Sequence, residues 1–300
     1  MKLYREGKVK KVWVVDDDSL EFEFTDHISV FDKIIPSDIP FKGETLCRTA
    51  TYWLKLCEEA GIRTDFKQLV AGNRMRVKRV DVIPDYSKLN NGTVNYLIPL
   101  EFICRHYNAG SLNDRIRSGE ISAGSLGYDK GHVPVYGEKL PEMFFETTTK
   151  LEETDRNLTT EEAMRISGLT KAEYDHVFDV ITRIDGIIAK EAGSRGLIHV
   201  DGKKEFAYDE KRRLMIVDTF GTADEDRWWD AKMYEQGKCV ELSKEMVRQY
   251  YRDIGYHDKL MKARKAGTEE PDIPALPEKM IEEVSRLYID MYGKLTGLKF

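Results

Sequence analysis

The sequence predicts an α/β fold of the α+β kind, with mainly antiparallel sheets, flanking helices and a helical C-terminal portion. Strands are predicted early in the chain, where residues 9–15 and 20–24 alternate apolar and polar side chains around an acidic turn at 16–19. Helices are predicted where apolar residues recur every three or four positions, as at 44–61 and 171–192. Strands therefore dominate the first third and helices the last.

The remaining elements follow from the same two signals. Residues 66–82 alternate like a strand, and the apolar stretch 96–105 is typical of a strand in the centre of a sheet. Because such a strand can act as a hinge, we expect two domains, with residues 1–96 in the first and residues 97–300 in the second. Further helices are predicted to start at Thr159 or Thr160 and to span 242–253 and 277–292.

The amino-acid composition and net charge exclude some classes of function. The chain has 300 residues, with 47 Lys and Arg against 53 Asp and Glu and a net charge of −6, whereas a general nucleic-acid binder would carry a basic excess. The four cysteines are widely spaced without a CxxC pattern, which is typical of free thiols in a reducing cytosol. No apolar run reaches the length of a membrane span, and the first six residues form no signal peptide. We therefore expect a cytoplasmic protein with neither nucleic-acid nor membrane partners.

The charged stretch 196–229 is predicted to hold the chain's central β-hairpin. Residues 197–208 form the first strand of this prediction, 209–212 the loop and 213–218 the returning strand. Side chains alternate along a strand, so three charged residues share one face of the first strand: Asp201, Lys203 and Glu205.

A four-residue loop fixes the pairing of this hairpin. It would place Lys203 opposite Asp218, and Glu205 opposite Ile216. Two carboxylates close together repel each other unless a cation lies between them, and Mg²⁺ is bound by carboxylates together with substrate phosphates. A solvated face with cross-strand ion pairs explains the same residues, so this stretch alone leaves both interpretations open.

Two other segments could bind anions. Lys8 and Lys10 lie on one face of a hairpin that could cover a nucleotide, although lysines also protect ordinary edge strands. Gly110 and Ser111 precede a helical stretch, where free N–H groups can bind an anion, although an N-cap at Ser111 explains the same residues. The loop at 25–43 is rich in short polar residues and is predicted to carry function.

Six motifs in order make the chain resemble the SAICAR synthetase family (phosphoribosylaminoimidazole-succinocarboxamide synthases), from Gly7 nearly to the C-terminus. They are Gly7-Lys8-Val9-Lys10-Lys11-Val12-Trp13, Asp26-His27-Ile28-Ser29-Val30-Phe31-Asp32, Pro40-Phe41-Lys42-Gly43, Ile98-Pro99-Leu100-Glu101 with Arg105 and Gly110-Ser111, Asp201-Gly202-Lys203-Lys204-Glu205-Phe206, and Asp218 with Arg227.

The resemblance implies an ATP-dependent ligase with a two-domain, ATP-grasp-like fold. The β-rich domain of residues 1–96 would cover ATP, and the domain of residues 97–300 would carry the metal and substrate sites. The family's reaction joins L-aspartate to the carboxylate of 5-amino-1-(5-phospho-D-ribosyl)imidazole-4-carboxylate, with ATP as co-substrate and Mg²⁺ as cofactor. An acyl phosphate would activate that carboxylate. A small-molecule kinase on a related scaffold and a non-catalytic nucleotide-binding protein are the alternatives, and a homo-oligomer is compatible with each.

The resemblance also assigns expected roles by matching position. ATP-binding residues would be Lys8, Val9, Lys10, Leu97, Glu205 and Asp218, of which Glu205 and Asp218 would hold the metal. Substrate-binding residues would be Asp26, Ser29, Lys42, Arg105, Ser111, Lys203 and Arg227. Catalytic residues would be Lys203, Arg227 and Asp32. His27 departs from the family's usual arginine, and Lys244 and Arg248 match a helix motif without an assigned role.

Overall fold

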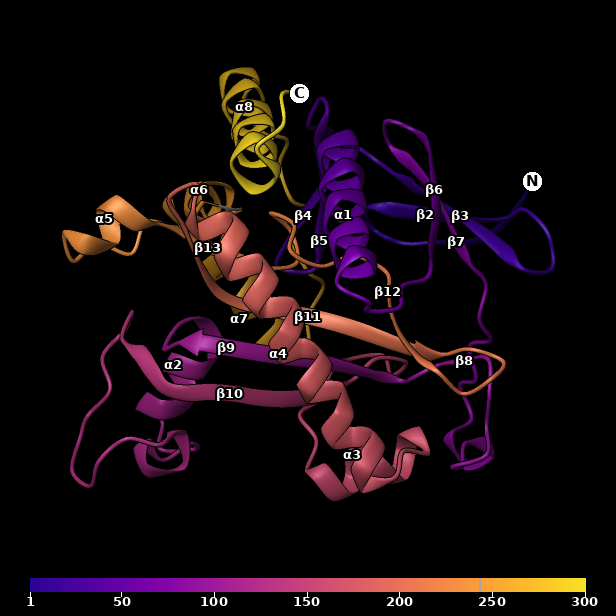
Figure 1. Ribbon diagram of the computed structural model, residues 1–300. Coiled ribbons are helices and arrows are strands. Elements are labelled where there is room, and N and C mark those ends of the chain that lie inside the picture. Colours follow the sequence, from indigo (N-terminus) through magenta and orange to yellow (C-terminus); the bar gives the residue numbers. More distant parts are fainter. Residues whose placement is uncertain (243) are drawn as a thin grey trace.

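Two antiparallel sheets form the framework of the computed structural model, which describes residues 1–242 and 244–300 (Figure 1). The N-terminal sheet has the order β1-β2-β3-β7-β6. Its strands are β1 (Lys2–Glu6), β2 (Lys10–Val14), β3 (Ser19–Phe24), β6 (Phe66–Ala71) and β7 (Arg74–Lys78).

The second sheet carries the central hairpin. Its main path is β10-β9-β11-β12, and β8 and β13 also pair with β11. Its strands are β8 (Tyr96–Leu97), β9 (Leu100–Tyr107), β10 (Lys139–Thr149), β11 (Leu197–Tyr208), β12 (Leu214–Val217) and β13 (Arg227–Asp230). A separate two-stranded sheet contains β4 (His27–Val30) and β5 (Lys33–Asp38).

Helices cover the sheets through apolar faces. The buried residues of α1 include Leu46, Trp53 and Leu54, and this helix packs on β3, β6 and β7 as well as on α8. Helix α4 packs on β11 (Figure 1) and begins with a capping box of Thr170 and Glu173. The helices are α1 (Lys42–Glu59), α2 (Gly110–Arg117), α3 (Thr160–Ser167), α4 (Lys171–Gly193), α5 (Ala231–Glu235), α6 (Glu245–Asp253), α7 (Tyr256–Ala266) and α8 (Glu278–Thr296), with 3₁₀ turns η1 (Tyr86–Lys88) and η2 (Ala123–Leu126).

Among the described residues, none of these helices is both long enough and apolar enough to cross a membrane.

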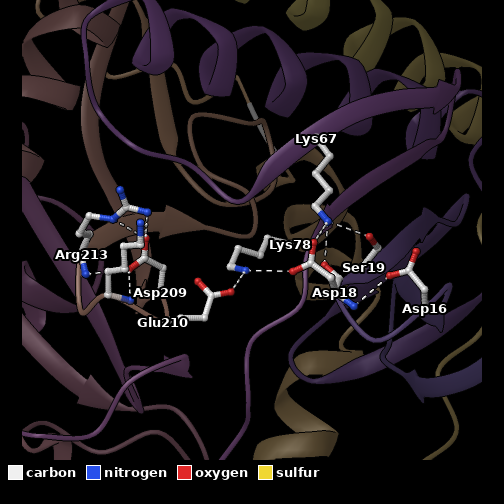
Figure 2. Close-up of polar contacts among 9 residues, drawn as sticks. Asp16, Asp18, Ser19, Lys67, Lys78, Asp209, Glu210 and Arg213 are labelled. Atoms are coloured by element: carbon white, nitrogen blue, oxygen red, sulfur yellow. Dashed lines mark hydrogen bonds and ion pairs between the residues drawn. The ribbon is translucent and has the colours of Figure 1, made fainter.

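The two sheets meet along one edge of the hairpin. Thr64 forms a parallel bridge with Ile216 of β12. Figure 2 shows a line of ion pairs on the surface nearby, in which Lys78 of β7 contacts both Asp18 and Glu210. The predicted fold class is confirmed. The division at residue 96 stays a prediction, and β8 spans it.

The predicted hairpin register is wrong by one residue. Tyr208 pairs with Leu214, and Glu205 pairs with Val217 rather than with Ile216. The loop is one residue longer than predicted because Arg212 adopts a left-handed conformation with φ 52°. The Asp209 carboxylate stabilises this loop by accepting the backbone N–H of Arg213 at 2.9 Å (Figure 2). Lys203 and Asp218 are therefore not cross-strand partners.

Other element predictions need smaller corrections. The expected strand 66–82 is the β6–β7 hairpin, and 96–105 is interrupted between β8 and β9. Helix α6 begins at Glu245 instead of 242, and Ser243 lies outside the described residues. Strands β1, β4, β5, β10 and β13 and helices α5 and α7 were not predicted, and β4 and β5 lie in the segment 25–43 that was expected to be a loop. Thr159 is confirmed as the cap of α3, since its hydroxyl accepts the N–H of Glu162.

Candidate active site

A cavity of about 430 Å³ lies between the two sheets. Its walls come from the turn between β1 and β2, from β2, β3 and β7, and from β8, β11 and β12. The cavity brings together all six residues expected to bind ATP: Lys8, Val9, Lys10, Leu97, Glu205 and Asp218. Lys203 also lines it, together with three residues that were given no site role from the sequence: Asp65, Lys150 and Glu225.

One side of this cavity is apolar. Leu97 and Val80 pack against Val217 of β12, and Phe22 of β3 also lines the space. An apolar wall beside charged groups suits a ligand with a flat base at one end and phosphates at the other.

The other side carries lysine–carboxylate pairs. The Lys10 ammonium contacts the Asp218 carboxylate, and Lys150 Nζ lies 2.5 Å from Glu205 Oε2. Lys203 Nζ lies 2.9 Å from Glu101 Oε1 and 3.6 Å from Glu225 Oε2. These pairs neutralise charges that water reaches poorly.

The pairs shift the pKa values of their members. Burial alone would lower the pKa of Lys150, but the carboxylates of Glu205 and Asp218 outweigh it and raise this pKa. Burial would raise the pKa of Asp218, whereas Lys10 and Lys150 hold it below its usual value. At neutral pH these groups are therefore ionised.

Asp218 has an unusual backbone. Its φ of 63° is left-handed, which costs roughly 1–2 kcal/mol for a residue with a Cβ atom. The Asp218 N–H donates to Asp65 Oδ2 at 3.3 Å. Asp65 is 3% exposed, and burial, followed by the nearby Asp218 charge, raises the pKa of Asp65 well above its usual value. Strain of this kind is concentrated at functional sites.

An arginine pair comes from two strands of the second sheet, with Arg105 on β9 and Arg227 on β13. Asp201 Oδ2 accepts from Arg105 Nη1 at 3.2 Å and from Arg227 Nη1 at 2.9 Å. Arg105 is 7% exposed and also donates to Glu146 at 2.6 Å and to the Ser111 hydroxyl at 3.2 Å. The two guanidinium groups are thus fixed by one carboxylate.

The alternative role considered for Ser111 is wrong. Helix α2 begins at Gly110 with Ala109 as its N-cap and without a side-chain cap. Ser111 lies in the first turn, where its hydroxyl is free to accept from Arg105. Gly110 has φ 55°, and a Cβ atom there would lie 2.5 Å from Arg227 Nη1. The missing side chain lets the Arg227 guanidinium lie against the helix start.

A second cavity, of about 340 Å³, adjoins Arg227. Gly110 and Asn113 of α2 line it, as do Arg248 and Arg252 of α6. Arg227 also donates to Glu241 at 2.9 Å. Arginine forks in an open cavity suit a phosphate or carboxylate ligand.

The expected substrate residues of the 25–43 loop do not converge. Asp32 is exposed and pairs with Lys8 at 3.1 Å, at the rim of the cavity between the two sheets. The Asp26 carboxylate accepts the Gly43 N–H at 2.9 Å and lines a different cavity, and Ser29 pairs with Ile34 within the β4–β5 sheet.

Lys42 is fully buried at the start of α1. Its ammonium lies 2.8 Å from Asp224 Oδ2, and Lys244 lies 3.2 Å from the same oxygen. Tyr288 donates to the other Asp224 oxygen at 2.5 Å. Lys244, which had no assigned role in the sequence, therefore belongs to this buried cluster through its contact with Asp224.

The loop after Asp218 is held at two points around Glu225. Asp224 binds the buried cluster, while Asp226 Oδ2 lies 2.6 Å from His199 Nε2 and Asp226 Oδ1 accepts the Gly221 N–H at 2.8 Å. Glu225, between them, lines the cavity between the two sheets. The run of acidic residues at 224–226 was the only sequence signal for this arrangement.

The residues present fit a magnesium ion. Mg²⁺ prefers oxygen ligands, and Glu205, Asp218 and Glu225 supply carboxylates on the wall where phosphates would lie. Asp65 Oδ1 is a buried oxygen without a hydrogen-bond partner among the described residues.

An apolar wall, lysines on a covering hairpin and paired carboxylates define a nucleotide-dependent α/β enzyme with a separate anion cavity. The chain belongs to the SAICAR synthetase family, whose model matches residues 3–263. This membership confirms the predicted activity, an ATP-dependent ligase of purine biosynthesis, over the small-molecule kinase.

Relatives and solved structures agree with this assignment. The chain is 54% identical to phosphoribosylaminoimidazole-succinocarboxamide synthase of Thermoplasma volcanium and 53% identical to that of Thermoplasma acidophilum, with all of each chain covered. A SAICAR synthetase solved in complex with ADP matches with TM-score 0.71 and 25% identity, over 100% of this chain and 99% of that one. The Saccharomyces cerevisiae enzyme complexed with SAICAR has the same fold, with TM-score 0.77 and 23% identity over 100% and 96%.

Proposed function

We propose that this chain joins L-aspartate to the carboxylate of 5-amino-1-(5-phospho-D-ribosyl)imidazole-4-carboxylate, consuming ATP and releasing ADP, phosphate and the succinocarboxamide. One observation carries the proposal: a single cavity gathers the lysines, carboxylates and apolar side chains that the family resemblance assigns to ATP. The names of the relatives, and the ADP and SAICAR of the solved structures, support the same substrates.

The chemistry requires an activated carboxylate. An oxygen of the substrate carboxylate attacks the γ-phosphorus, and the bond to the bridging oxygen breaks, releasing ADP. The L-aspartate amine then attacks the acyl carbon of the acyl phosphate, the carbon–oxygen bond to phosphate breaks, and the nitrogen loses its extra proton. Little covalent chemistry falls to the protein, which must position the reactants and neutralise charge.

ATP would lie with its base against Leu97 and Val9 and its phosphates toward Lys8 and Lys10. Lys10 would exchange its contact with Asp218 for a phosphate oxygen. Glu205 and Asp218 would hold Mg²⁺, which when bound neutralises phosphate charge. Release of Lys10 from Asp218 and of Lys150 from Glu205 would free both carboxylates for the ion.

The ribonucleotide would occupy the cavity beside the arginine pair. Of the arginine pair, Arg227 reaches this cavity, while the more buried Arg105, together with Ser111, would complete the phosphate site. Lys203, in the ATP cavity, would neutralise the carboxylate that becomes phosphorylated.

L-Aspartate would bind near the rim of the ATP cavity. Asp32 lies at this rim beside Lys8 and could orient the amine there. Asp26 and Ser29 would shape the loop that carries Asp32. Lys42 would act through Asp224, since its side chain is fully buried.

The proposed cellular location of the enzyme is the cytoplasm. The four cysteines are free thiols, in keeping with a reducing cytoplasm. A homo-oligomer stays a prediction.

The proposal is tested by measuring ADP and succinocarboxamide together. With ATP, Mg²⁺ and the ribonucleotide present, both products should require L-aspartate and should appear in equal amounts. ADP release that continues without L-aspartate, with no amide formed, would contradict the ligase.

A further inference from the structure

Asp65 is a buried carboxylate at the junction of the two sheets. Its backbone N–H donates to the Ile216 carbonyl at 3.1 Å, and its carbonyl accepts the Lys78 N–H at 2.6 Å. These two bonds fix the residue against β12 and β7. Its side chain lines the ATP cavity and is 3% exposed.

The two oxygens of this carboxylate have different surroundings. Oδ2 accepts the Asp218 N–H at 3.3 Å. Oδ1 is buried and has no hydrogen-bond partner among the described residues. An unpaired carboxylate oxygen without water costs free energy unless a cation or donor reaches it.

The other carboxylates lining the cavity each have a lysine. Asp218 contacts Lys10, Glu205 contacts Lys150 at 2.5 Å, and Glu225 lies 3.6 Å from Lys203. Across residues 1–242 and 244–300, no lysine or arginine lies within ion-pair distance of Asp65. Among the described residues, Asp65 is therefore the one carboxyl group lining this cavity that has no lysine partner.

We propose that Asp65 is a third carboxylate of the divalent-cation site, with Oδ1 serving the cation that Asp218 and Glu205 hold. The inference rests on the proposed function, because that function supplies the cation and its first two carboxylates. Oxygen is the ligand that Mg²⁺ and Mn²⁺ prefer, and a third carboxylate strengthens the site by its charge. Asp65 thus supports Asp218 through Oδ2 and serves the cation through Oδ1.

A purely structural role for Asp65 makes a different prediction. An asparagine at this position keeps the shape and an oxygen for the Asp218 N–H, but it cannot lose a proton to bind a cation as a carboxylate. If Asp65 only supports the backbone of Asp218, Asp65→Asn should leave cation binding intact. If it serves the cation, the same variant should weaken binding.

The experiment measures Mn²⁺ binding to the full chain with ADP present, from the electron paramagnetic resonance signal of free Mn²⁺. Asp65→Asn should raise the Mn²⁺ dissociation constant at least about tenfold, as should Asp218→Asn. Its thermal midpoint should not fall, because asparagine keeps the shape of the side chain and an oxygen for the Asp218 N–H.

Asp209→Asn is the matched control. Asp209 is also a buried carboxylate, 5% exposed, and it also accepts a backbone N–H, but it lies in the loop of the β11–β12 hairpin and pairs with the Arg213 guanidinium at 2.7 Å (Figure 2). This variant should bind Mn²⁺ like the unmodified protein.

Two outcomes separate the inference from the function on which it rests. Unchanged Mn²⁺ affinity in Asp65→Asn, with a loss in Asp218→Asn, overturns the role of Asp65 and leaves the proposed metal pair standing. Unchanged affinity in Asp65→Asn, Asp218→Asn and Glu205→Gln alike overturns the metal site itself.

Discussion

Lys10 and Asp218 meet across the boundary between the two sheets. The Lys10 ammonium, from β2, contacts the Asp218 carboxylate just beyond β12, and it also lies 4.4 Å from the centre of the Phe22 ring. An ion pair therefore joins the two sheets across the cavity. ATP phosphates would compete for Lys10 while a cation competes for Asp218, so the nucleotide and the metal should favour each other's binding.

Asp218→Asn tests the metal role of this carboxylate. The amide keeps the shape but loses the charge, so we expect kcat to fall by about 100-fold or more. The fold should persist, since the backbone N–H can still donate to Asp65. Steady-state kinetics and circular dichroism check this, with the exposed Glu210→Gln as control. Activity equal to the unmodified enzyme would falsify the assignment.

Gly110→Ala tests the approach of α2 to Arg227. The new Cβ atom would lie 2.5 Å from Arg227 Nη1, and φ of 55° disfavours alanine. We expect a KM for the ribonucleotide raised about tenfold or more, because Arg227 must move, and a KM for ATP that changes little.

Gly186→Ala provides the comparison for that variant. Gly186 lies within α4, and a Cβ atom there would meet no atom within 4 Å. Alanine should stabilise this helix by about 0.5–1 kcal/mol without changing either KM. If both glycine variants behave alike in kinetics, the close approach at Gly110 has no functional importance.

Tyr288→Phe tests whether α8 positions the loop that carries Glu225. It removes the hydroxyl that donates to Asp224 at 2.5 Å. We expect a several-fold loss of kcat together with a destabilisation of about 1 kcal/mol.

Tyr292→Phe is the matched control, one turn further along α8. Its hydroxyl accepts from Arg48 at 3.0 Å, away from the loop, so this variant should lose similar stability but keep kcat. Equal kinetics in the two tyrosine variants would show that the contact with Asp224 matters only for stability.

The pH dependence of stability should reveal the charge of Asp224. Burial alone would raise the pKa of Asp224, but Lys244 and Lys42 hold it well below its usual range. A carboxyl group with a depressed pKa in the folded state stabilises fully above its unfolded pKa of about 3.9 and loses this contribution as the pH falls below that value.

Urea unfolding of the unmodified protein and of Asp224→Asn measures this contribution. The difference in unfolding free energy should shrink by about 1 kcal/mol between pH 6 and pH 3. The exposed Asp290→Asn should show no such change. A difference for Asp224→Asn that stays constant with pH would rule out the ionised buried cluster.

Much of the fold could be predicted because local patterns specify it. Strand β11 has the bounds expected from its alternation, and α4 extends one residue beyond the expected helix. Strand β1 escaped prediction because all of its residues are exposed, so no buried face imposes a pattern. The hairpin register depends on the positive φ of Arg212, and nothing about an arginine in the sequence predicts this conformation.

The residues of the candidate site could be predicted only where they belong to motifs of the family. The resemblance supplied Lys10, Glu205 and Asp218, and the structure places them in one cavity. Asp65 and Lys150 reach that cavity from segments that are distant in sequence, so only the tertiary fold reveals their place in it.

The most direct measurement follows oxygen from the ribonucleotide carboxylate. If the carboxylate is activated as an acyl phosphate, a substrate labelled with ¹⁸O in that carboxylate must transfer one labelled oxygen to phosphate for each amide formed. Mass spectrometry of the released phosphate should show this transfer, and it should depend on L-aspartate. Phosphate that carries no label while the amide accumulates would contradict the acyl phosphate.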